Sequence, residues 1–151
     1  MPLSTSSLLE AFAALGMRST AQRSAMAEWL AQASAEGRGF SADDMWRELK
    51  DSRRPVGRAT VFRALDALET QGLVDRVELP SGSRRYRACG GDAHHHHIVC
   101  VACGTVADVR NCLSGQLAAA IAAETGFTLE RHSIDLFGRC RRCRDAVQPP
   151  A

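Results

Sequence analysis

The chain of 151 residues has almost no lysine: Lys50 is the only one. Arginine therefore supplies nearly all of the positive charge, with a local cluster at Arg53, Arg54, Arg58 and Arg63. Arginine makes forked hydrogen bonds to phosphates and to guanine edges, but a high-GC codon bias produces the same preference without any function. Because the net charge is only +2, the cluster is more informative about a nucleic-acid partner than the total charge is.

The sequence also lacks an apolar run long enough to cross a membrane, and it lacks the basic start and apolar core of a signal peptide. We therefore expect a cytoplasmic protein without a membrane partner. In a reducing cytosol, the six cysteines argue against a disulfide framework and in favour of metal binding or redox chemistry. The length fits one domain or two small ones.

The first half predicts helices. A short helix over 8–15 comes first, and Ser19 and Ser41 each suit the N-cap of a further helix. Residues 57–71 carry the strongest helical pattern, followed by Gly72 as a residue suited to the helix end. The inward stripe of this helix consists of Val61, Leu65 and Leu68.

A β-hairpin is predicted after these helices. Two β-type runs, 73–79 and 84–89, flank the turn sequence Pro80-Ser81-Gly82-Ser83. Three helices with the last one basic, followed by a hairpin, describe a winged helix-turn-helix. Any small α+β core has the same order, with its arginines on a solvated face, so this pattern alone leaves DNA binding open.

The second half predicts a mixture of strands and a helix. Strands are expected over 94–101, 105–109 and 127–137, with an amphipathic helix over 113–125. The predicted fold class is therefore α+β, with the winged helix followed by a smaller α/β unit.

Two Cys-x-x-Cys pairs, Cys100/Cys103 and Cys140/Cys143, indicate a structural zinc site. Each pair places two sulfurs on one side of a turn, and four thiolates at about 2.3 Å complete the tetrahedral shell of Zn²⁺. Such a site contributes on the order of 10 kcal/mol to folding. Reduced free cysteines and a redox dithiol are the alternatives, although thioredoxin-like proteins have a single motif of this kind at the start of a helix.

Four consecutive histidines precede the first cysteine pair. On a strand, His95 and His97 would point to one face and the other two histidines to the opposite face. Cys89 and Asp75 belong to the two hairpin strands and could reach one histidine pair if the hairpin packs against the second half. A metal site of these four residues would bridge the two halves, and its occupancy would select one conformation of a hinged molecule.

Together these segments resemble the ferric uptake regulator family of metal-dependent bacterial repressors. The resemblance covers roughly residues 8–145. The matching segments are Arg18-Ser19-Thr20-Ala21-Gln22-Arg23, Arg58-Ala59-Thr60-Val61-Phe62-Arg63-Ala64-Leu65, Gly72-Leu73-Val74, the histidine run with Cys100-Val101-Ala102-Cys103-Gly104, and Gly126-Phe127 with His132 and Cys140-Arg141-Arg142-Cys143. The resemblance implies a homodimer with a winged-helix DNA-binding domain over 1–88, a hinge over 89–93 and an α/β dimerisation and metal-binding domain over 94–151.

The resemblance also implies roles for the metal ligands. The family's sensor site takes histidines at the positions of His95 and His97, and zinc uptake regulators add a thiolate from the hairpin, where Cys89 and Asp75 stand. A soft thiolate suits zinc better than manganese or a harder ferrous site. We therefore expect a zinc sensor site at Asp75, Cys89, His95 and His97, and two or more Zn²⁺ per subunit.

A third site of the family is incomplete in this chain. It would use His94, His96 and His132, but its acidic position falls at Gly115. Asp108 or a water could substitute for that acid. Alternatively, Asp108 could join the sensor site, as an acid at this offset does in some relatives.

The expected function is a zinc-responsive transcriptional repressor that binds palindromic, double-stranded operator DNA as a metal-loaded homodimer and controls zinc uptake genes. Contacts to bases or nearby phosphates are expected from Arg58, Thr60, Phe62 and Arg63. Contacts to the DNA backbone or minor groove are expected from Arg18, Arg23, Arg53 and Arg54. Phe62 stands where the family commonly has tyrosine, so the hydroxyl contact is lost.

Three other functions are considered. A zinc hydrolase or deaminase is disfavoured because deaminases pair His-x-Glu with Pro-Cys-x-x-Cys, and this chain has no glutamate beside its histidines and no proline before either cysteine pair. We therefore expect no enzymatic activity and no small-molecule substrate. An iron- or manganese-sensing regulator of the same family, and a thiol or peroxide sensor that releases zinc on oxidation, stay open.

Overall fold

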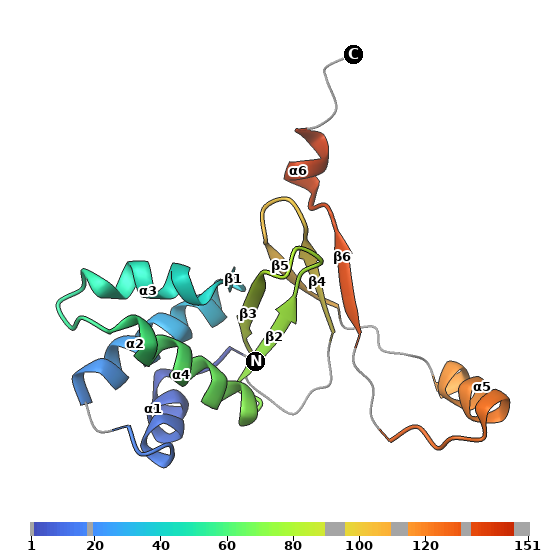
Figure 1. The fold of residues 1–151 in the computed structure, drawn as a ribbon, viewed down its shortest axis with the longest axis horizontal. Coiled ribbons are helices and arrows are strands. Elements are labelled where there is room, and N and C mark those ends of the chain that lie inside the picture. Colours follow the sequence, from blue (N-terminus) through green and yellow to red (C-terminus); the bar gives the residue numbers. More distant parts are fainter. Residues whose placement is uncertain (1, 18–19, 90–95, 110–114, 131–133, 147–151) are drawn as a thin grey trace.

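The computed structural model describes residues 2–17, 20–89, 96–109, 115–130 and 134–146. Its helices are α1 (Thr5–Ala14), α2 (Thr20–Ala35), α3 (Ala42–Lys50), α4 (Arg58–Thr70), α5 (Gly115–Thr125) and α6 (Arg141–Asp145). Its strands are β1 (Gly39–Phe40), β2 (Val74–Glu78), β3 (Arg84–Ala88), β4 (His96–Cys100), β5 (Val106–Val109) and β6 (Asp135–Gly138). Helices α1 to α4 gather on one side of the molecule (Figure 1). None of the helices in these ranges is long and apolar enough to cross a membrane.

The strands form two sheets, which confirm the predicted α+β fold class. The first sheet has the order β1-β3-β2 and contains the predicted hairpin, with all pairs antiparallel. The second sheet has the order β5-β4-β6, in which β4 is antiparallel to β5 and parallel to β6. Helices α3 and α4 followed by the hairpin give the winged-helix order.

Ser41 is the N-cap of helix α3, as the sequence predicts, and it forms a capping box with Asp44. Ser41 Oγ accepts a hydrogen bond from the backbone N–H of Asp44 at 3.0 Å, and Asp44 Oδ2 accepts one from the backbone N–H of Ser41 at 2.9 Å. Two N–H groups at the helix start that would otherwise lack partners are thereby satisfied. Ser19, the other predicted N-cap, lies outside the described residues.

Helix α4 packs its predicted stripe into the core of the first half. Val61, Leu65 and Leu68 have no exposed surface and join side chains from α1, α2 and α3 in one hydrophobic cluster. Arg58 and Arg63 on the same helix remain exposed. Packing of the apolar stripe therefore places the basic side chains of α4 on the surface of the molecule.

Strand β1 is an element that the sequence does not predict, since the residues before α3 have the pattern of a loop. Gly39 and Phe40 pair with Arg87 and Tyr86 of β3. Phe40 is 1% exposed, with its ring edge-on to Trp29 at 4.7 Å between centroids and stacked on Tyr86 at 6.1 Å. A strand of two residues has no periodic pattern of its own. It forms because residues far away in the chain supply its partner strand and the aromatic pocket of Phe40.

The predicted long strand over 127–137 is wrong. Strand β6 spans only Asp135–Gly138, and residues 126–130 have no regular structure. The parallel pairing with β4 extends only from His97 to Cys100. Residues 126–130 pair with no strand among the described residues, and a strand needs a neighbour to satisfy its backbone groups.

The two sheets meet through a small apolar cluster, a close approach at Gly39 and polar contacts from β3. Val77 and Leu79 from the hairpin pack with Val99 of β4 and Val106 of β5. A Cβ atom added to Gly39 would lie 2.1 Å from Cγ2 of Val106, so only glycine permits this contact. Burying a valine stabilises a fold by roughly 1.5–3 kcal/mol. The winged-helix part is therefore docked on the second sheet in this structure.

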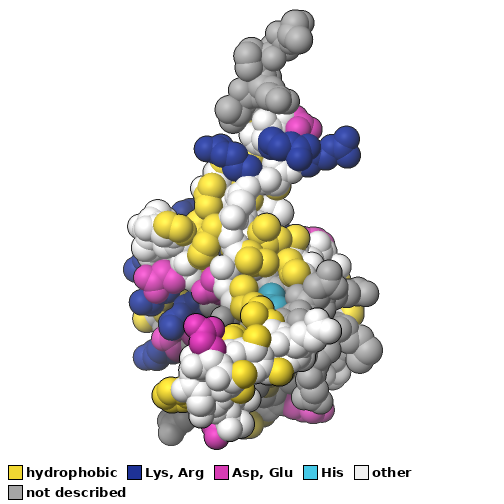
Figure 2. All heavy atoms as spheres, turned by 90° about the vertical axis from the view of Figure 1, so that its right-hand side faces the viewer, with side chains coloured by type: hydrophobic (Ala, Val, Ile, Leu, Met, Phe, Trp, Pro, Cys, Tyr) yellow, Lys and Arg dark blue, Asp and Glu magenta, His cyan; other side chains and the backbone are white. Residues whose placement is uncertain are grey.

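Helix α5 lies apart from both sheets (Figure 1). All of its residues are described, and none is buried. Figure 2 views the molecule from this side, where hydrophobic side chains gather in the middle of the face. The large exposed hydrophobic residues among those described are Ile98, Val101, Leu117, Phe127, Leu129 and Phe137. They all belong to the second half, and an uncovered apolar surface of this kind indicates an interaction face.

We expect Gly39→Ala to lower the free energy of unfolding by about 1–3 kcal/mol, because the added methyl group would overlap Cγ2 of Val106. The double variant Gly39→Ala/Val106→Ala makes room for that methyl group, so its loss should be smaller than the sum of the two single losses. Urea unfolding of the four proteins measures this coupling energy.

The matched control is Gly115→Ala, because a Cβ atom at Gly115 meets nothing within 4 Å. This control should leave the free energy of unfolding unchanged or raise it slightly, because alanine favours a helix more than glycine does. Strictly additive losses for Gly39→Ala and Val106→Ala would contradict the contact between the two sheets.

Candidate functional site

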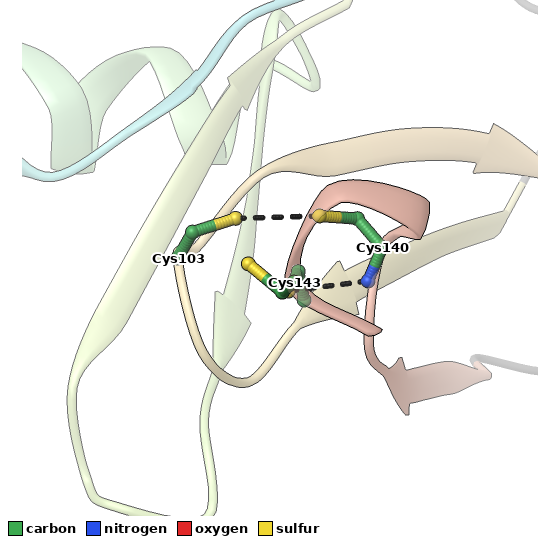
Figure 3. Close-up of side chains that lie close together, drawn as sticks. Cys103, Cys140 and Cys143 are labelled. Atoms are coloured by element: carbon green, nitrogen blue, oxygen red, sulfur yellow. Dashed lines mark hydrogen bonds between the residues drawn. The ribbon is translucent and has the colours of Figure 1, made fainter. Parts of the chain in front are cut away.

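The four cysteines of the two Cys-x-x-Cys pairs meet at one end of the second sheet. Cys100 ends β4 and Cys103 lies in the turn after it, whereas Cys140 precedes α6 and Cys143 lies within α6. The parallel pairing of Cys100 with Gly138 brings the two pairs together. The four sulfurs lie within 4.8 Å of one another. Figure 3 shows the sulfurs of Cys103, Cys140 and Cys143 close together.

Hydrogen bonds to the sulfurs favour the ionised form of two of these cysteines. The hydroxyl of Thr105, 3.2 Å from Cys103 Sγ, lowers the pKa of Cys103 to about 5. The backbone N–H of Cys140 donates to Cys100 Sγ at 3.3 Å and lowers the pKa of Cys100. Hydrogen bonding to Cys103 and Cys140 raises the pKa of Cys143 to about 12. Without a cation, the four clustered thiols cannot all be ionised at once. Four sulfur donors fit Zn²⁺, so the cluster could hold this ion.

A second group of metal-ligand side chains lies between the two sheets. His97 Nε2 is 2.9 Å from Asp75 Oδ2 and 3.7 Å from Cys89 Sγ, and the three ligand atoms lie within 4.8 Å of one another. Asp75 is on β2, Cys89 directly follows β3, and His97 is on β4. Docking of the hairpin on the second sheet therefore brings these three residues together. His95, the fourth expected ligand, lies outside the described residues.

Burial keeps the Cys89 thiol protonated. Desolvation, and after it the negative charge of Asp75, raise the pKa of Cys89 to about 12. A cation that binds Cys89 as a thiolate must therefore displace a proton. A carboxylate, a thiolate and an imidazole together suit a borderline-soft divalent ion such as Zn²⁺.

Asp108 lies beside His97, on the face of the second sheet opposite to the one to which His96 points. The antiparallel register places Asp108 directly opposite His97, and Asp108 Oδ1 is 3.3 Å from His97 Nδ1. Because side chains alternate across a strand, His96 points to the opposite face of the sheet. His94 and His132, the remaining histidines of the expected third site, lie outside the described residues.

Sequence reasoning missed Arg87 on β3. This side chain donates from Nη2 to Asp108 Oδ2 at 3.0 Å, and Arg87 is only 7% exposed. Arginine is seldom buried unless it is paired. The neighbouring Arg84 is exposed, and nothing in the local sequence distinguishes the two arginines. Only the packing of the two sheets reveals that Arg87 lies at the second ligand group.

The expected DNA-contacting residues lie mainly on α4 and on the turn before it. The exposed side chains are those of Arg53, Arg58 and Arg63. The half-buried side chains are those of Arg23, Arg54, Thr60 and Phe62. Arg18 lies outside the described residues. The structure therefore places most of the expected residues on α4 and on the turn before it.

Two of these arginines are paired within the chain. Arg58 donates to the carboxylate of Asp43 at 2.8 Å and 3.3 Å, and its guanidinium lies over the ring of Phe62, 4.8 Å from the centroid. The hydrogen bond from Arg58 lowers the pKa of Asp43. Arg54 pairs with Glu28. A DNA phosphate that approaches the Nε and Nη2 edge of Arg58 must replace Asp43. This competition was not predicted because it arises from the packing of α3 on α4.

Comparison with known proteins agrees with this arrangement. The profile of the "Ferric uptake regulator family" matches residues 14–137. The chain is 35% identical over 128 residues to the "Ferric uptake regulation protein" of Cupriavidus metallidurans, covering 85% of this chain and 87% of the relative. It is 36% identical over 131 residues to the "Zinc uptake regulation protein" of Mycobacterium tuberculosis, covering 87% and 98%.

A solved structure supports the same assignment. The ferric uptake regulator of Vibrio cholerae has a TM-score of 0.65 to this chain at 29% sequence identity, covering 90% of this chain and 98% of that one. A family profile over most of the chain, together with relatives above 30% identity along most of their length, shows that the chain belongs to the ferric uptake regulator family of metal-responsive transcription regulators.

Proposed function

We propose that the protein is a zinc-responsive transcriptional repressor that binds palindromic operator DNA as a metal-loaded homodimer and controls genes of zinc uptake and homeostasis. The observation that carries this proposal is the group of Asp75, Cys89 and His97 between the two sheets. Its thiol favours zinc over ferrous or manganous ions, which prefer nitrogen and oxygen ligands. The similarity to a protein named zinc uptake regulation protein supports the same metal.

The four-cysteine cluster would hold a structural zinc ion. Cys100, Cys103, Cys140 and Cys143 all lie at one end of the second sheet, so the ion would link the end of β4 to α6. Four protein ligands leave no open position for a reactant, and such a closed site stabilises a fold without catalysing a reaction.

The second group would act as the sensor site, with His95 as its fourth ligand. Asp75 and Cys89 come from the hairpin, whereas His97 comes from the second sheet. These residues converge on one cation only while the hairpin is docked on the second sheet. Metal binding therefore selects the docked arrangement by the difference in affinity between docked and undocked states. In this proposal the winged helix spans 1–88, the hinge 89–93 and the dimerisation domain 94–151.

The exposed side chains of α4 would contact operator DNA. In a winged helix the recognition helix enters the major groove, and two-fold symmetry spaces two such helices about one helical turn apart. The proposed contacts to bases or nearby phosphates come from Arg58, Thr60, Phe62 and Arg63. The proposed contacts to the backbone or minor groove come from Arg18, Arg23, Arg53 and Arg54. The uncovered α5 and the apolar face around it would pack against a second copy of the chain.

Two other functions of the same fold have observations in their favour. An iron- or manganese-responsive regulator is favoured by the second carboxylate, Asp108, beside His97, and by the similarity to a protein named ferric uptake regulation protein. A thiol or peroxide sensor is favoured by the low pKa of Cys103, since thiolates are the form that oxidants attack. Counting bound zinc before and after mild peroxide treatment separates a thiol sensor from a metal sensor.

We expect operator binding to increase with buffered free Zn²⁺ and not with equal free Fe²⁺ or Mn²⁺, measured by fluorescence anisotropy of a palindromic DNA. Cys89→Ser should shift the zinc midpoint at least tenfold, because the loss of even about 1.4 kcal/mol of binding has that effect. Cys112→Ser is the matched control, because Cys112 belongs to neither Cys-x-x-Cys pair. A ferrous response that zinc does not reproduce would make the protein an iron regulator.

We expect Cys143→Ser to remove one zinc ion per subunit and to unfold the second half, because a structural site contributes on the order of 10 kcal/mol to folding. Metal analysis and far-ultraviolet circular dichroism of purified protein measure the two effects. Cys112→Ser should keep both the zinc content and the spectrum. Unchanged zinc content in Cys143→Ser would contradict the four-cysteine site.

We expect Arg58→Ala to weaken operator binding by about 1–3 kcal/mol, and Asp43→Asn to strengthen it, because the latter releases Arg58 from its ion pair. The salt dependence of binding measures both effects. Asp51→Asn is the charge-matched control: Asp51 follows α3 and pairs with Lys50 at 3.9 Å instead of with Arg58. Equal effects of Asp43→Asn and Asp51→Asn would indicate a change of net charge alone.

A further inference from the structure

We propose that Asp108 is a positioning residue of the sensor site and not one of its metal ligands: it orients His97, and Arg87 of the winged helix holds Asp108 in that role. The inference rests on the proposed function, because it concerns how one ligand of the proposed sensor site is held. It differs from the two roles that the sequence suggested for Asp108, which were those of a metal ligand.

The two nitrogens of His97 face different partners. Nε2 lies 2.9 Å from Asp75 Oδ2 and 3.7 Å from Cys89 Sγ, whereas Nδ1 lies 3.3 Å from Asp108 Oδ1. A histidine that binds a metal through one nitrogen usually donates the other N–H to a carboxylate, which fixes its tautomer and the direction of its ring. Asp108 is not among the residues whose ligand atoms lie within 4.8 Å of one another. The 3.3 Å approach of Nδ1 to Asp108 Oδ1 lacks the alignment of a hydrogen bond in this structure. With a metal ion on Nε2, Nδ1 would carry the proton and face Asp108.

Arg87 holds the second oxygen of the same carboxylate. Its Nη2 donates to Asp108 Oδ2 at 3.0 Å, and the side chain of Arg87 is 9% exposed whereas that of Asp108 is 44% exposed. Nε and Nη1 of Arg87 are buried without a hydrogen-bond partner among the described residues. If Asp108 turned away to bind a metal, the buried guanidinium would lose its carboxylate, which is costly in a desolvated site. The pairing therefore keeps Asp108 on Nδ1 of His97.

The guanidinium of Arg87 is itself placed by the winged helix. A Cβ atom at Gly37 would lie 3.2 Å from Nη1 and Nη2 of Arg87, so the arginine packs directly against the turn that follows α2. Gly37 has φ +64°, a backbone conformation that glycine adopts at helix ends. Arg87 of β3 is also the antiparallel strand partner of Gly39 of β1. The contacts from Gly37 through Arg87 and Asp108 to His97 therefore connect the DNA-binding half to a sensor ligand of the second sheet.

The experiment uses Co²⁺ as a spectroscopic probe of full-length protein whose four-cysteine site is already filled with zinc. Wild-type protein should show a thiolate-to-cobalt charge-transfer band and the intense ligand-field bands of a tetrahedral ion. Asp108→Asn should show the same bands with an affinity for Co²⁺ that is about 10–100-fold weaker, the usual effect of removing an outer partner of a histidine ligand. Arg87→Met should weaken the affinity in the same way, and Arg87→Lys should restore part of it.

Arg85→Met is the matched control. Arg85 lies on the same strand, pairs with Asp44 at 3.0 Å, and also reaches the second half of the chain, where it packs against Gly104. It has no described contact with Asp108 or His97. Removing this guanidinium should leave both the affinity for Co²⁺ and the spectrum unchanged.

Three results would overturn the inference. A change of the ligand-field bands in Asp108→Asn would make Asp108 a ligand. Unchanged affinity in both Asp108→Asn and Arg87→Met would make the ion pair purely structural, and an equal loss in Arg85→Met would assign the effect to docking in general. Absence of the thiolate-to-cobalt band in wild-type protein is distinguishable from all three, because it would remove the proposed sensor site itself and the inference with it.

Discussion

Val106 packs against Gly39 and joins Val77 and Val99 in a cluster, and this contact brings the two sheets together. The cluster is small, so docking contributes far less to stability than the main core of the first half does. A weak contact of this kind suits a regulator, because the free energy of binding one cation is enough to change the population of the docked state. The glycine that permits the close approach is therefore one of the contacts that set how the two halves lie against each other.

The two groups of metal ligands differ in their relation to that contact. The four cysteines all belong to the second half, so a metal there would be independent of docking. Asp75 and Cys89 belong to the hairpin and His97 to the second sheet, so a metal there would depend on docking. The same ion can therefore have a structural role in one site and a regulatory role in the other, because the difference lies in which elements supply the ligands.

Charge pairing within the chain affects both proposed functions. Asp43 pairs with Arg58 of the proposed recognition helix, and Asp108 pairs with Arg87 behind the proposed sensor site. The first pair is solvent-exposed, so DNA phosphates can exchange with the carboxylate at small cost. The second pair is partly buried, and breaking it would leave a desolvated guanidinium. The partner of Arg58 can therefore be exchanged for a phosphate, whereas the ion pair of Arg87 keeps Asp108 in place.

Local sequence determined the elements whose signals are contained within a few residues. Three features follow from residue spacing that is visible within a short segment of the chain. They are the capping box at Ser41, the stripe of Val61, Leu65 and Leu68, and the two cysteine pairs. Only the tertiary structure decided β1, the short β6, and the pairing of Arg87 with Asp108. These features depend on a neighbouring strand or on a counter-charge from a distant part of the chain, and no local pattern states which distant residues will pack together.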